Sequence, residues 1–274
     1  MTRLAANLTM MFTELSFLDR FAAAAEAGFE AVEFVSPYAE SPEAVADAAR
    51  RHDLTVALFN LPPGDWAAGE RGFAADPDRI EEFQQSLDLS LTYARATGCR
   101  TLHLMAGKIP DDADRGQWTD TLVSNTRLAA DRVAADGVTL VLEPINTRID
   151  MPGYFYDRTD AVLDVIDSVG RENVRLLYDV YHMQIMEGDV ARTIERLLPR
   201  IGHIQIADNP GRHEPGTGEL NFPWLFGRIA SMNYNGWIGC EYVPTADTRE
   251  GLHWAAPYLN DRLGGSLPTE STGF

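Results

Sequence analysis

Cysteine is scarce in this chain, and the scarcity limits the kinds of protein it can be. Only two cysteines, Cys99 and Cys240, occur among 274 residues. Two thiols are too few for a disulfide framework, and they lie too far apart in the sequence to form a metal-binding pair. We therefore expect both to be buried free thiols in a reducing cytoplasm.

Positive charge and long apolar runs are also lacking. The chain has 23 Lys and Arg residues against 41 Asp and Glu residues, which gives a formal net charge of −18. This balance disfavours nucleic acid and anionic membranes as partners. Residues 1–8 lack the apolar core of a signal peptide, and no segment approaches the length of a membrane span. The sequence predicts a soluble cytoplasmic protein.

Short apolar runs and helix-like segments alternate along almost the whole sequence. Strands are expected at residues 4–11, 29–35, 54–60, 101–105, 138–143, 175–179, 203–208 and 237–243. Helices are expected at residues 16–27, 42–52, 78–97, 119–135, 157–169, 189–198, 222–231 and 248–263. Strict alternation implies a parallel sheet, and eight units imply closure into a barrel.

The expected architecture is therefore α/β, a single (β/α)8 TIM barrel over residues 1–263 with a flexible tail at 264–274. An open doubly wound sheet is the main alternative. It is disfavoured because no glycine-rich dinucleotide fingerprint follows the first strand.

The end of the fifth expected strand organises the rest of the interpretation. Its apolar run stops at Glu143, and Pro144 follows. Proline removes a backbone donor and favours an extended conformation in the residue before it, so Glu143 is held at the strand tip. Three later strands end near Asp179, Gln205 and Glu241, at intervals that each match one strand–helix unit. Since the C-terminal ends of barrel strands share one mouth, we expect these four side chains to converge.

Three carboxylates and one amide oxygen form an oxygen-only ligand set. Such a set suits Mg²⁺ or Mn²⁺ better than Zn²⁺, and three converging acids would repel one another without a cation. Glu143 and Glu241 lie on strands that face each other across much of the mouth. One glutamate would remove a carbon-bound proton and the other would return one, while the metal polarises the carbonyl and stabilises an enediolate. This predicts proton-transfer isomerisation of a hydroxy-ketone or aldehyde.

Several basic side chains are candidates for substrate binding. His182 closely follows the strand that ends at Asp179, and Arg212 lies in the Gly/Pro-rich loop after the next strand, where a guanidinium would bind a substrate carboxylate or hydroxyl. His103 and Lys108 are weaker candidates from the fourth strand and its loop. His203 is expected to pack or to support the site. The plainer alternatives are structural histidines and a solvated surface arginine.

The loop over residues 61–72 is long and rich in turn-forming residues. Long loops in compact domains are usually functional or disordered. Trp66 in this loop is expected to be buried, which favours a functional loop.

Several motifs together resemble the hydroxypyruvate isomerase family of the xylose isomerase-like barrels. They cover nearly the whole chain: Asn60–Trp66 with Gly69–Gly72, Leu142–Asn146, Tyr178–Gln184, His203–Asp208 with Pro215–Glu219, and Glu241–Tyr242. The resemblance implies reversible conversion of hydroxypyruvate to tartronate semialdehyde (2-hydroxy-3-oxopropanoate). It implies that Glu143 and Glu241 transfer the proton while binding the metal with Asp179 and Gln205. His182 matches a substrate-orienting position, and Arg212 matches less securely because the loop length differs.

Other activities remain open at this point. The resemblance extends to 2-oxotetronate (3-dehydrotetronate) isomerases, which use the same chemistry on a four-carbon acid. Ketose 3-epimerases commonly carry histidine where Gln205 stands, so an epimerase is a weaker alternative. A metal-dependent endonuclease of the same superfamily is disfavoured by the charge of −18 and the shortage of histidine ligands. A non-catalytic binding barrel is disfavoured by the paired glutamates, and the sequence does not decide whether the barrel forms a homo-oligomer.

Overall fold

The computed structural model describes residues 2–259 of the chain, which form a closed barrel of eight parallel strands in sequence order. The predicted tail at 264–274 lies outside the described residues. No helix within residues 2–259 is long and apolar enough to cross a membrane. The strands are β1 (Leu4–Asn7), β2 (Ala31–Phe34), β3 (Thr55–Asn60), β4 (Thr101–His103), β5 (Thr139–Leu142), β6 (Val174–Asp179), β7 (Ile201–Ile206) and β8 (Ile238–Cys240). The predicted barrel is thus confirmed, and the open sheet is excluded.

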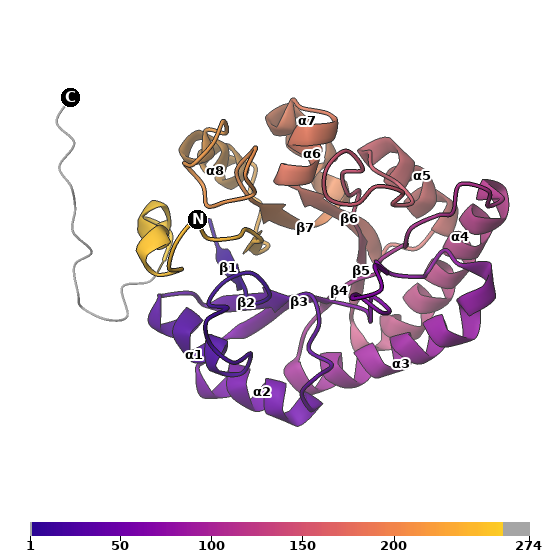
Figure 1. The fold of residues 1–274 in the computed structure, drawn as a ribbon, viewed down its shortest axis with the longest axis horizontal. Coiled ribbons are helices and arrows are strands. Elements are labelled where there is room, and N and C mark those ends of the chain that lie inside the picture. The colour runs from indigo at the N-terminus through magenta and orange to yellow at the C-terminus, as the bar shows by residue number, and fades with distance from the viewer. Residues whose placement is uncertain (1, 260–274) are drawn as a thin grey trace.

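Helices surround the strands on the outside (Figure 1). The α-helices are α1 (Asp19–Glu26), α2 (Pro42–Arg51), α3 (Ile80–Thr97), α4 (Arg115–Val133), α5 (Thr159–Val169), α6 (Val180–Met186), α7 (Val190–Leu197) and α8 (Phe222–Ser231). Short 3-10 helices are η1 (Pro77–Arg79), η2 (Ala134–Asp136), η3 (Leu198–Arg200) and η4 (Glu250–Ala255).

Local sequence signals fix where several helices begin and end. Ser41 accepts a hydrogen bond from the Ala44 amide at the start of α2, and Asp114 does the same for two amides at the start of α4. Gly98 and Gly170 end α3 and α5 with φ values of 73° and 64°, a left-handed conformation that glycine adopts without steric cost.

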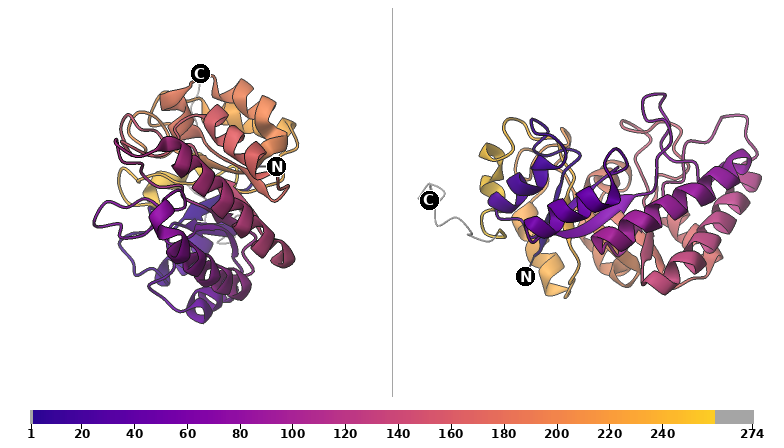
Figure 2. Two further views of the ribbon diagram at one scale, coloured as in Figure 1. Left: turned by 90° about the vertical axis from the view of Figure 1, so that its right-hand side faces the viewer. Right: turned by 90° about the horizontal axis from the view of Figure 1, so that it is seen from below.

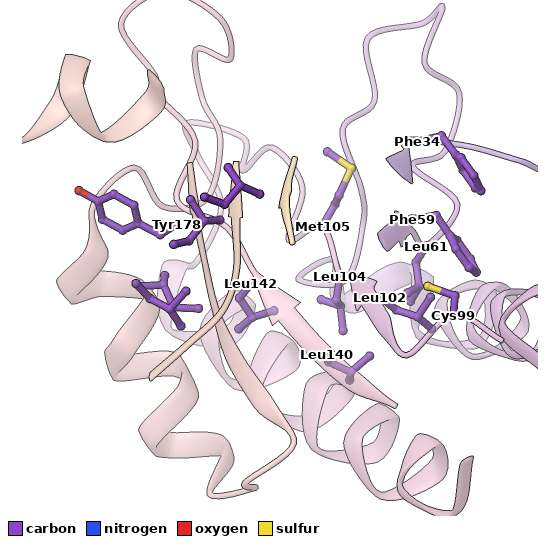
Figure 3. Close-up of a cluster of buried hydrophobic side chains, with 14 of the residues drawn as sticks. Phe34, Phe59, Leu61, Cys99, Leu102, Leu104, Met105, Leu140, Leu142 and Tyr178 are labelled. Carbon is purple, nitrogen blue, oxygen red and sulfur yellow. The ribbon is translucent and has the colours of Figure 1, made fainter. Parts of the chain in front are cut away.

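Side chains alternate between the two faces of each strand, and this separates the core from the site. One face carries apolar residues that belong to the main hydrophobic cluster. Figure 3 shows part of this cluster, including Leu102 on β4 with Leu140 and Leu142 on β5. The other face carries small residues such as Ala5, Ala31 and Ala57, which form a separate small cluster. Further along β1 and β2 this second face becomes polar at Asn7 and Glu33, and buried His203 and Gln205 on β7 join them through hydrogen bonds to Glu33.

Two sequence predictions about helices need correction. The expected final helix over 248–263 is only the 3-10 helix η4 within the described part of the chain. In contrast, α6 was not predicted. It begins directly after β6, where the run of aromatic and β-branched residues looks like a continued strand. The helix forms because the Asp179 side chain accepts a hydrogen bond from the Tyr181 amide and caps its first turn.

Candidate active site

The four side chains singled out at the strand ends meet at one end of the barrel. Glu143 follows β5, Asp179 ends β6, Gln205 lies in β7 and Glu241 follows β8, and all four are buried. Atoms of Glu143, Asp179 and Glu241, with a ring nitrogen of His182, all lie within 4.8 Å of one another. Gln205 is paired with Asp179 in the register between β6 and β7.

Several oxygen atoms of these four side chains have no hydrogen-bond partner. Asp179 uses Oδ1 to cap α6 and has no partner for Oδ2. Gln205 donates from Nε2 to Glu33 at 2.9 Å and has no partner for Oε1, and Oε1 of Glu143 is also unpartnered. Buried oxygens normally have hydrogen-bond partners, and hard divalent cations bind carboxylate and amide oxygens. These residues therefore fit a divalent cation.

Burial and mutual repulsion disfavour the charged forms of the three acids. Burial raises the pKa of Glu143 well above its usual range, and nearby Glu241 and Asp179 raise it further. Burial raises the pKa of Glu241 to about 8, although the Arg212 guanidinium opposes the shift. Burial likewise raises the pKa of Asp179 to about 6. Only a cation would keep all three carboxylates ionised at neutral pH.

Glu33 on β2 is the main functional residue that the sequence analysis missed. Its carboxylate is fully buried and accepts hydrogen bonds from Asn7 at 3.0 Å, His203 at 2.7 Å and Gln205 at 2.9 Å. A Cβ on Gly239 would lie within 2.3 Å of this carboxylate, so only glycine leaves room for it. Glu33 therefore orients Gln205 so that its oxygen, rather than its nitrogen, faces the acids. The signal was an acidic residue inside a fully buried strand.

His182 lies in α6 directly beside the acids. Its Nε2 is 3.7 Å from Glu143 Oε1 and 3.6 Å from Asp179 Oδ2. Its Nδ1 lies 2.6 Å from Asn146 Nδ2. Burial lowers the pKa of His182 well below its usual range, and the positive charge of Arg212 lowers it further. The imidazole is therefore neutral at physiological pH.

Arg212 brings the positive charge of the site. Its Nη2 donates to Glu241 Oε2 at 3.0 Å, and its Nη1 donates to Asp150 Oδ1 at 3.1 Å. The residue has a φ of 57°, a conformation rare for arginine and typical of functional loops. Its loop is held by the Asp208 carboxylate, which accepts from four backbone amides, those of Asn209, Gly216, Gly218 and Leu220.

The remaining basic candidates lie in different surroundings. His103 is buried, with Nδ1 at 3.6 Å from Glu143 Oε2, and burial lowers its pKa to about 3. His203 supports the site through Glu33, in line with the expectation for it. Lys108, the only lysine in the sequence, is exposed and is not among the residues that line the cavity. Its backbone pairs with that of Tyr154.

A cavity of about 370 Å³ opens above the acids. Glu143, His182, Arg212 and Glu241 supply its polar side. The rest is mostly apolar and includes Met10, Val35, Trp66, Met105, Ile145 and Met151.

The long loop after β3 reaches this cavity, but the prediction that Trp66 is buried was wrong. Its side chain is 44% exposed because the loop projects beyond the helices on one side of the barrel (Figure 2, right). The Arg71 guanidinium stacks over the Trp66 ring at 3.6 Å and holds it in place. Trp66 therefore lines the cavity mouth from an exposed position.

Comparison with known proteins places this site in a family. The model of the xylose isomerase-like TIM barrel family matches residues 21–258. The chain is 52% identical to 2-oxo-tetronate isomerase from Cupriavidus necator, over 94% of this chain and 99% of that protein. It is 46% identical to hydroxypyruvate isomerase from Escherichia coli, over 94% of this chain and all of that protein.

A solved structure named as an AP endonuclease, family 2, from Brucella melitensis superposes with a TM-score of 0.92 at 49% identity. It covers 95% of this chain and all of the other. A D-allulose 3-epimerase from Methylomonas sp., at 22% identity and a TM-score of 0.71 over 95% of this chain and 91% of the other, shows the fold alone. The chain belongs to the xylose isomerase-like TIM barrel family and, within it, to the group that contains the hydroxypyruvate isomerases.

Proposed function

We propose that this chain is an aldose–ketose type isomerase that interconverts hydroxypyruvate and tartronate semialdehyde. One observation carries the proposal: Glu143 and Glu241 are buried carboxylates that enter the same cavity from β5 and β8. Two carboxylates placed beside a substrate can remove a proton from one carbon and deliver one to its neighbour. The similarity to the Escherichia coli hydroxypyruvate isomerase supports this reaction.

We propose that Glu143, Asp179, Gln205 and Glu241 hold Mg²⁺ or Mn²⁺. The unpartnered oxygens of Glu143, Asp179 and Gln205 support this assignment. When bound, the cation supplies a Lewis acid that polarises the substrate carbonyl and stabilises negative charge on its oxygen.

The protein residues divide the proton transfer between them. One of the two glutamates removes a carbon-bound proton from C3 of hydroxypyruvate, and the other delivers a proton to C2. The hydroxyl proton moves from the C3 oxygen to the C2 oxygen, so C3 becomes an aldehyde and C2 carries the hydroxyl group. Arg212 lies beside Glu241 and binds the substrate carboxylate, because a guanidinium matches a carboxylate in both charge and geometry. His182, placed between Glu143 and Asp179, orients the substrate oxygens. His103, with Nδ1 at 3.6 Å from Glu143 Oε2, is the weaker candidate for substrate binding.

A second candidate substrate is 2-oxotetronate, a four-carbon acid whose isomerisation uses the same transfer between C3 and C2. The 52% identity to the Cupriavidus necator enzyme favours it. The cavity of about 370 Å³ has room for either acid. The residue roles proposed above are the same for both substrates.

The wider assignment follows from charge and composition. The net charge of −18 opposes binding to nucleic acid, so we propose a small hydroxy-oxo acid as the substrate rather than abasic DNA. The two buried free cysteines favour a cytoplasmic enzyme, and hydroxypyruvate places it in carbohydrate and glyoxylate metabolism.

The direct test is turnover of hydroxypyruvate and of 2-oxotetronate by purified protein, with EDTA and with added Mg²⁺ or Mn²⁺. We expect metal-dependent isomerisation of at least one acid, and the ratio of kcat/KM values decides the physiological substrate. Activity on fructose or tagatose in place of both acids would favour an epimerase. Cleavage of abasic DNA without turnover of either acid would favour a nuclease.

A further inference from the structure

The side chain of Asn146 is held in one orientation by the turn that follows β5. Its Oδ1 accepts hydrogen bonds from the backbone amides of Ile149 and Asp150, both at 3.0 Å. Turning the amide over would place its NH2 group against two N–H donors. Asn146 is also fully buried, so neither arrangement can be rescued by solvent. The oxygen of this amide is therefore assigned to the turn, and its nitrogen must face the other way.

The Asn146 nitrogen has two acceptors within reach. It lies 2.6 Å from Asp150 Oδ2 and 2.6 Å from His182 Nδ1. An amide NH2 group has two hydrogens and no acceptor capacity. A carboxylate takes one of these hydrogens, and the ring nitrogen of His182 takes the other. Nδ1 of His182 must therefore present a lone pair, which in a neutral imidazole leaves the hydrogen on Nε2.

We propose that Asn146, fixed by its turn and by Asp150, locks His182 as the Nε2–H tautomer, so that His182 donates a hydrogen bond to a substrate oxygen. This inference rests on the proposed isomerase function. Nε2 is the nitrogen that faces the reaction centre, at 3.7 Å from Glu143 Oε1 and 3.6 Å from Asp179 Oδ2. A hydrogen on this nitrogen is on the side of the ring that faces the acids, where it would donate to the substrate oxygen on which negative charge develops in the enediolate.

The same tautomer excludes His182 as a metal ligand. A histidine binds a metal through a ring lone pair. Nδ1 has its lone pair engaged by Asn146, and Nε2 carries the hydrogen. Although His182 lies within 4.8 Å of three acids, it is therefore not a metal ligand and serves the substrate alone.

Asp150 links this histidine to the arginine on the other side of the cavity. Its Oδ2 accepts from Asn146 and from the Tyr181 hydroxyl at 3.1 Å, and its Oδ1 accepts from Arg212 Nη1 at 3.1 Å. Asp150 is thus a positioning residue with two separable effects. Through Asn146 it fixes the tautomer of His182, and directly it fixes the guanidinium that we assign to the substrate carboxylate.

Two variants separate these effects. In Asp150→Asn, the new amide keeps its oxygen toward Asn146 and Tyr181 and turns its nitrogen toward Arg212, so the tautomer stays and the arginine loosens. In the exchange variant Asn146→Asp with Asp150→Asn, the total charge of the pair is unchanged. Position 146 becomes an acceptor toward His182, while the oxygen at position 150 remains available to Arg212. The exchange therefore moves the hydrogen of His182 to Nδ1 and keeps the arginine in place.

The test is a two-bond ¹H–¹⁵N correlation spectrum of the Mg²⁺-loaded protein labelled at its six histidines, with His182 assigned by its loss in His182→Gln. We expect a hydrogen on Nε2 in the wild type and in Asp150→Asn, and on Nδ1 in the exchange variant. We expect kcat to fall about 100-fold or more in the exchange variant. For Asp150→Asn we expect mainly a KM increase of roughly tenfold. Asp160→Asn, an exposed acid on α5, is the matched control and should keep wild-type values.

The wild-type spectrum alone decides the tautomer, even if a variant does not fold. A hydrogen on Nδ1 in the wild type, or loss of the Nε2 hydrogen when Mg²⁺ binds, would overturn the inference. An exchange variant that folds, shifts the hydrogen to Nδ1 and retains wild-type kcat would also overturn it. If the Nε2–H tautomer is present but neither acid is turned over, the tautomer assignment stands and the proposed function fails.

Discussion

Glu33 and Glu143 are two buried glutamates in the same barrel, and their surroundings are opposite. Glu33 is surrounded by donors: Asn7, His203 and Gln205 all give hydrogen bonds to its carboxylate. Glu143 has an unpartnered Oε1, and its Oε2 is no closer than 3.6 Å to His103. Burial is equally deep in both cases, so burial does not separate a supporting acid from a reactive one.

The difference lies in what the protein leaves unsatisfied. A buried carboxylate without hydrogen-bond donors is costly, and folded proteins rarely keep one unless a ligand completes it. In the reactive cluster, Glu143 Oε1 and Asp179 Oδ2 have no donor, although Glu241 accepts a hydrogen bond from Arg212. Glu33, in contrast, is fully satisfied and holds Gln205 in place. The supporting role thus belongs to Glu33, and the proton transfer and metal binding are assigned to the neighbouring acids.

The largest effect should come from the incomplete cluster. We expect Glu143→Gln and Glu241→Gln each to reduce turnover by about 1,000-fold or more, because each removes a proton-transfer group. Metal content must be measured in the same samples, since both residues are assigned to the cation. Glu195→Gln, on the exposed face of α7, is the matched control and should keep full activity. Activity near the wild-type level in either site variant would remove the two-glutamate mechanism.

Glu33→Gln tests the supporting role by itself. It removes the carboxylate that holds Gln205 and leaves Glu143 and Glu241 unchanged. The NH2 group of a glutamine at position 33 would face the N–H donor of His203 or Gln205, so one of these hydrogen bonds would be lost. We expect metal affinity to weaken roughly 10- to 100-fold and the free energy of unfolding to fall by about 3 kcal/mol. Titration calorimetry and urea denaturation measure these two quantities. Unchanged metal affinity would show that Gln205 does not depend on Glu33.

The pH dependence of stability provides a third test, with a smaller expected effect. The pKa values of Glu241 and Asp179 are raised in the folded state to about 8 and about 6, so the metal-free folded state binds more protons than the unfolded state. Stability of the metal-free protein should therefore fall as pH rises from about 4 to 8. Added Mg²⁺ or Mn²⁺ should raise Tm more at pH 8 than at pH 5.

Thermal scans in EDTA and in excess metal measure this effect. The double variant Glu143→Gln with Glu241→Gln is the control, and its metal-free Tm should depend less on pH. A metal-dependent rise in Tm that is larger at pH 5 than at pH 8 would contradict the account.

Lys108→Met should have the smallest effect. The side chain is exposed and is not among the residues that line the cavity, so we expect kcat/KM to stay within about twofold of the wild-type value. Steady-state kinetics measure it. A loss of 100-fold would mean that the loop after β4 moves over the substrate.

Much of the fold could be predicted because it depends on local patterns. Alternating apolar strands and capped helices predicted the barrel, and the repeated polar strand ends predicted which side chains meet. The role of Glu33 could not be predicted in this way, because its partners lie on β1 and β7, far away in the sequence. The same holds for Asp150, which joins Asn146, Tyr181 and Arg212 only after the loops have folded.

Loop directions were the other limit of sequence reasoning. Lys108 is grouped with the site because it follows β4, but its side chain is exposed and is not among the residues that line the cavity. Trp66 was expected to be buried on hydrophobicity alone. Its position depends on the stack with Arg71 and on a loop that extends beyond the barrel, neither of which a local pattern predicts.

The most direct test of proton transfer between two glutamates is isomerisation of hydroxypyruvate in D2O with Mg²⁺ present. The tartronate semialdehyde is trapped as it forms by enzymatic reduction to glycerate, which prevents later exchange at C2. Because one glutamate removes the C3 proton and a different one supplies C2, we predict one solvent deuterium at C2 of the trapped glycerate. Retention of the substrate hydrogen at C2 would mean direct transfer between the carbons or a single shielded base, and it would contradict the account.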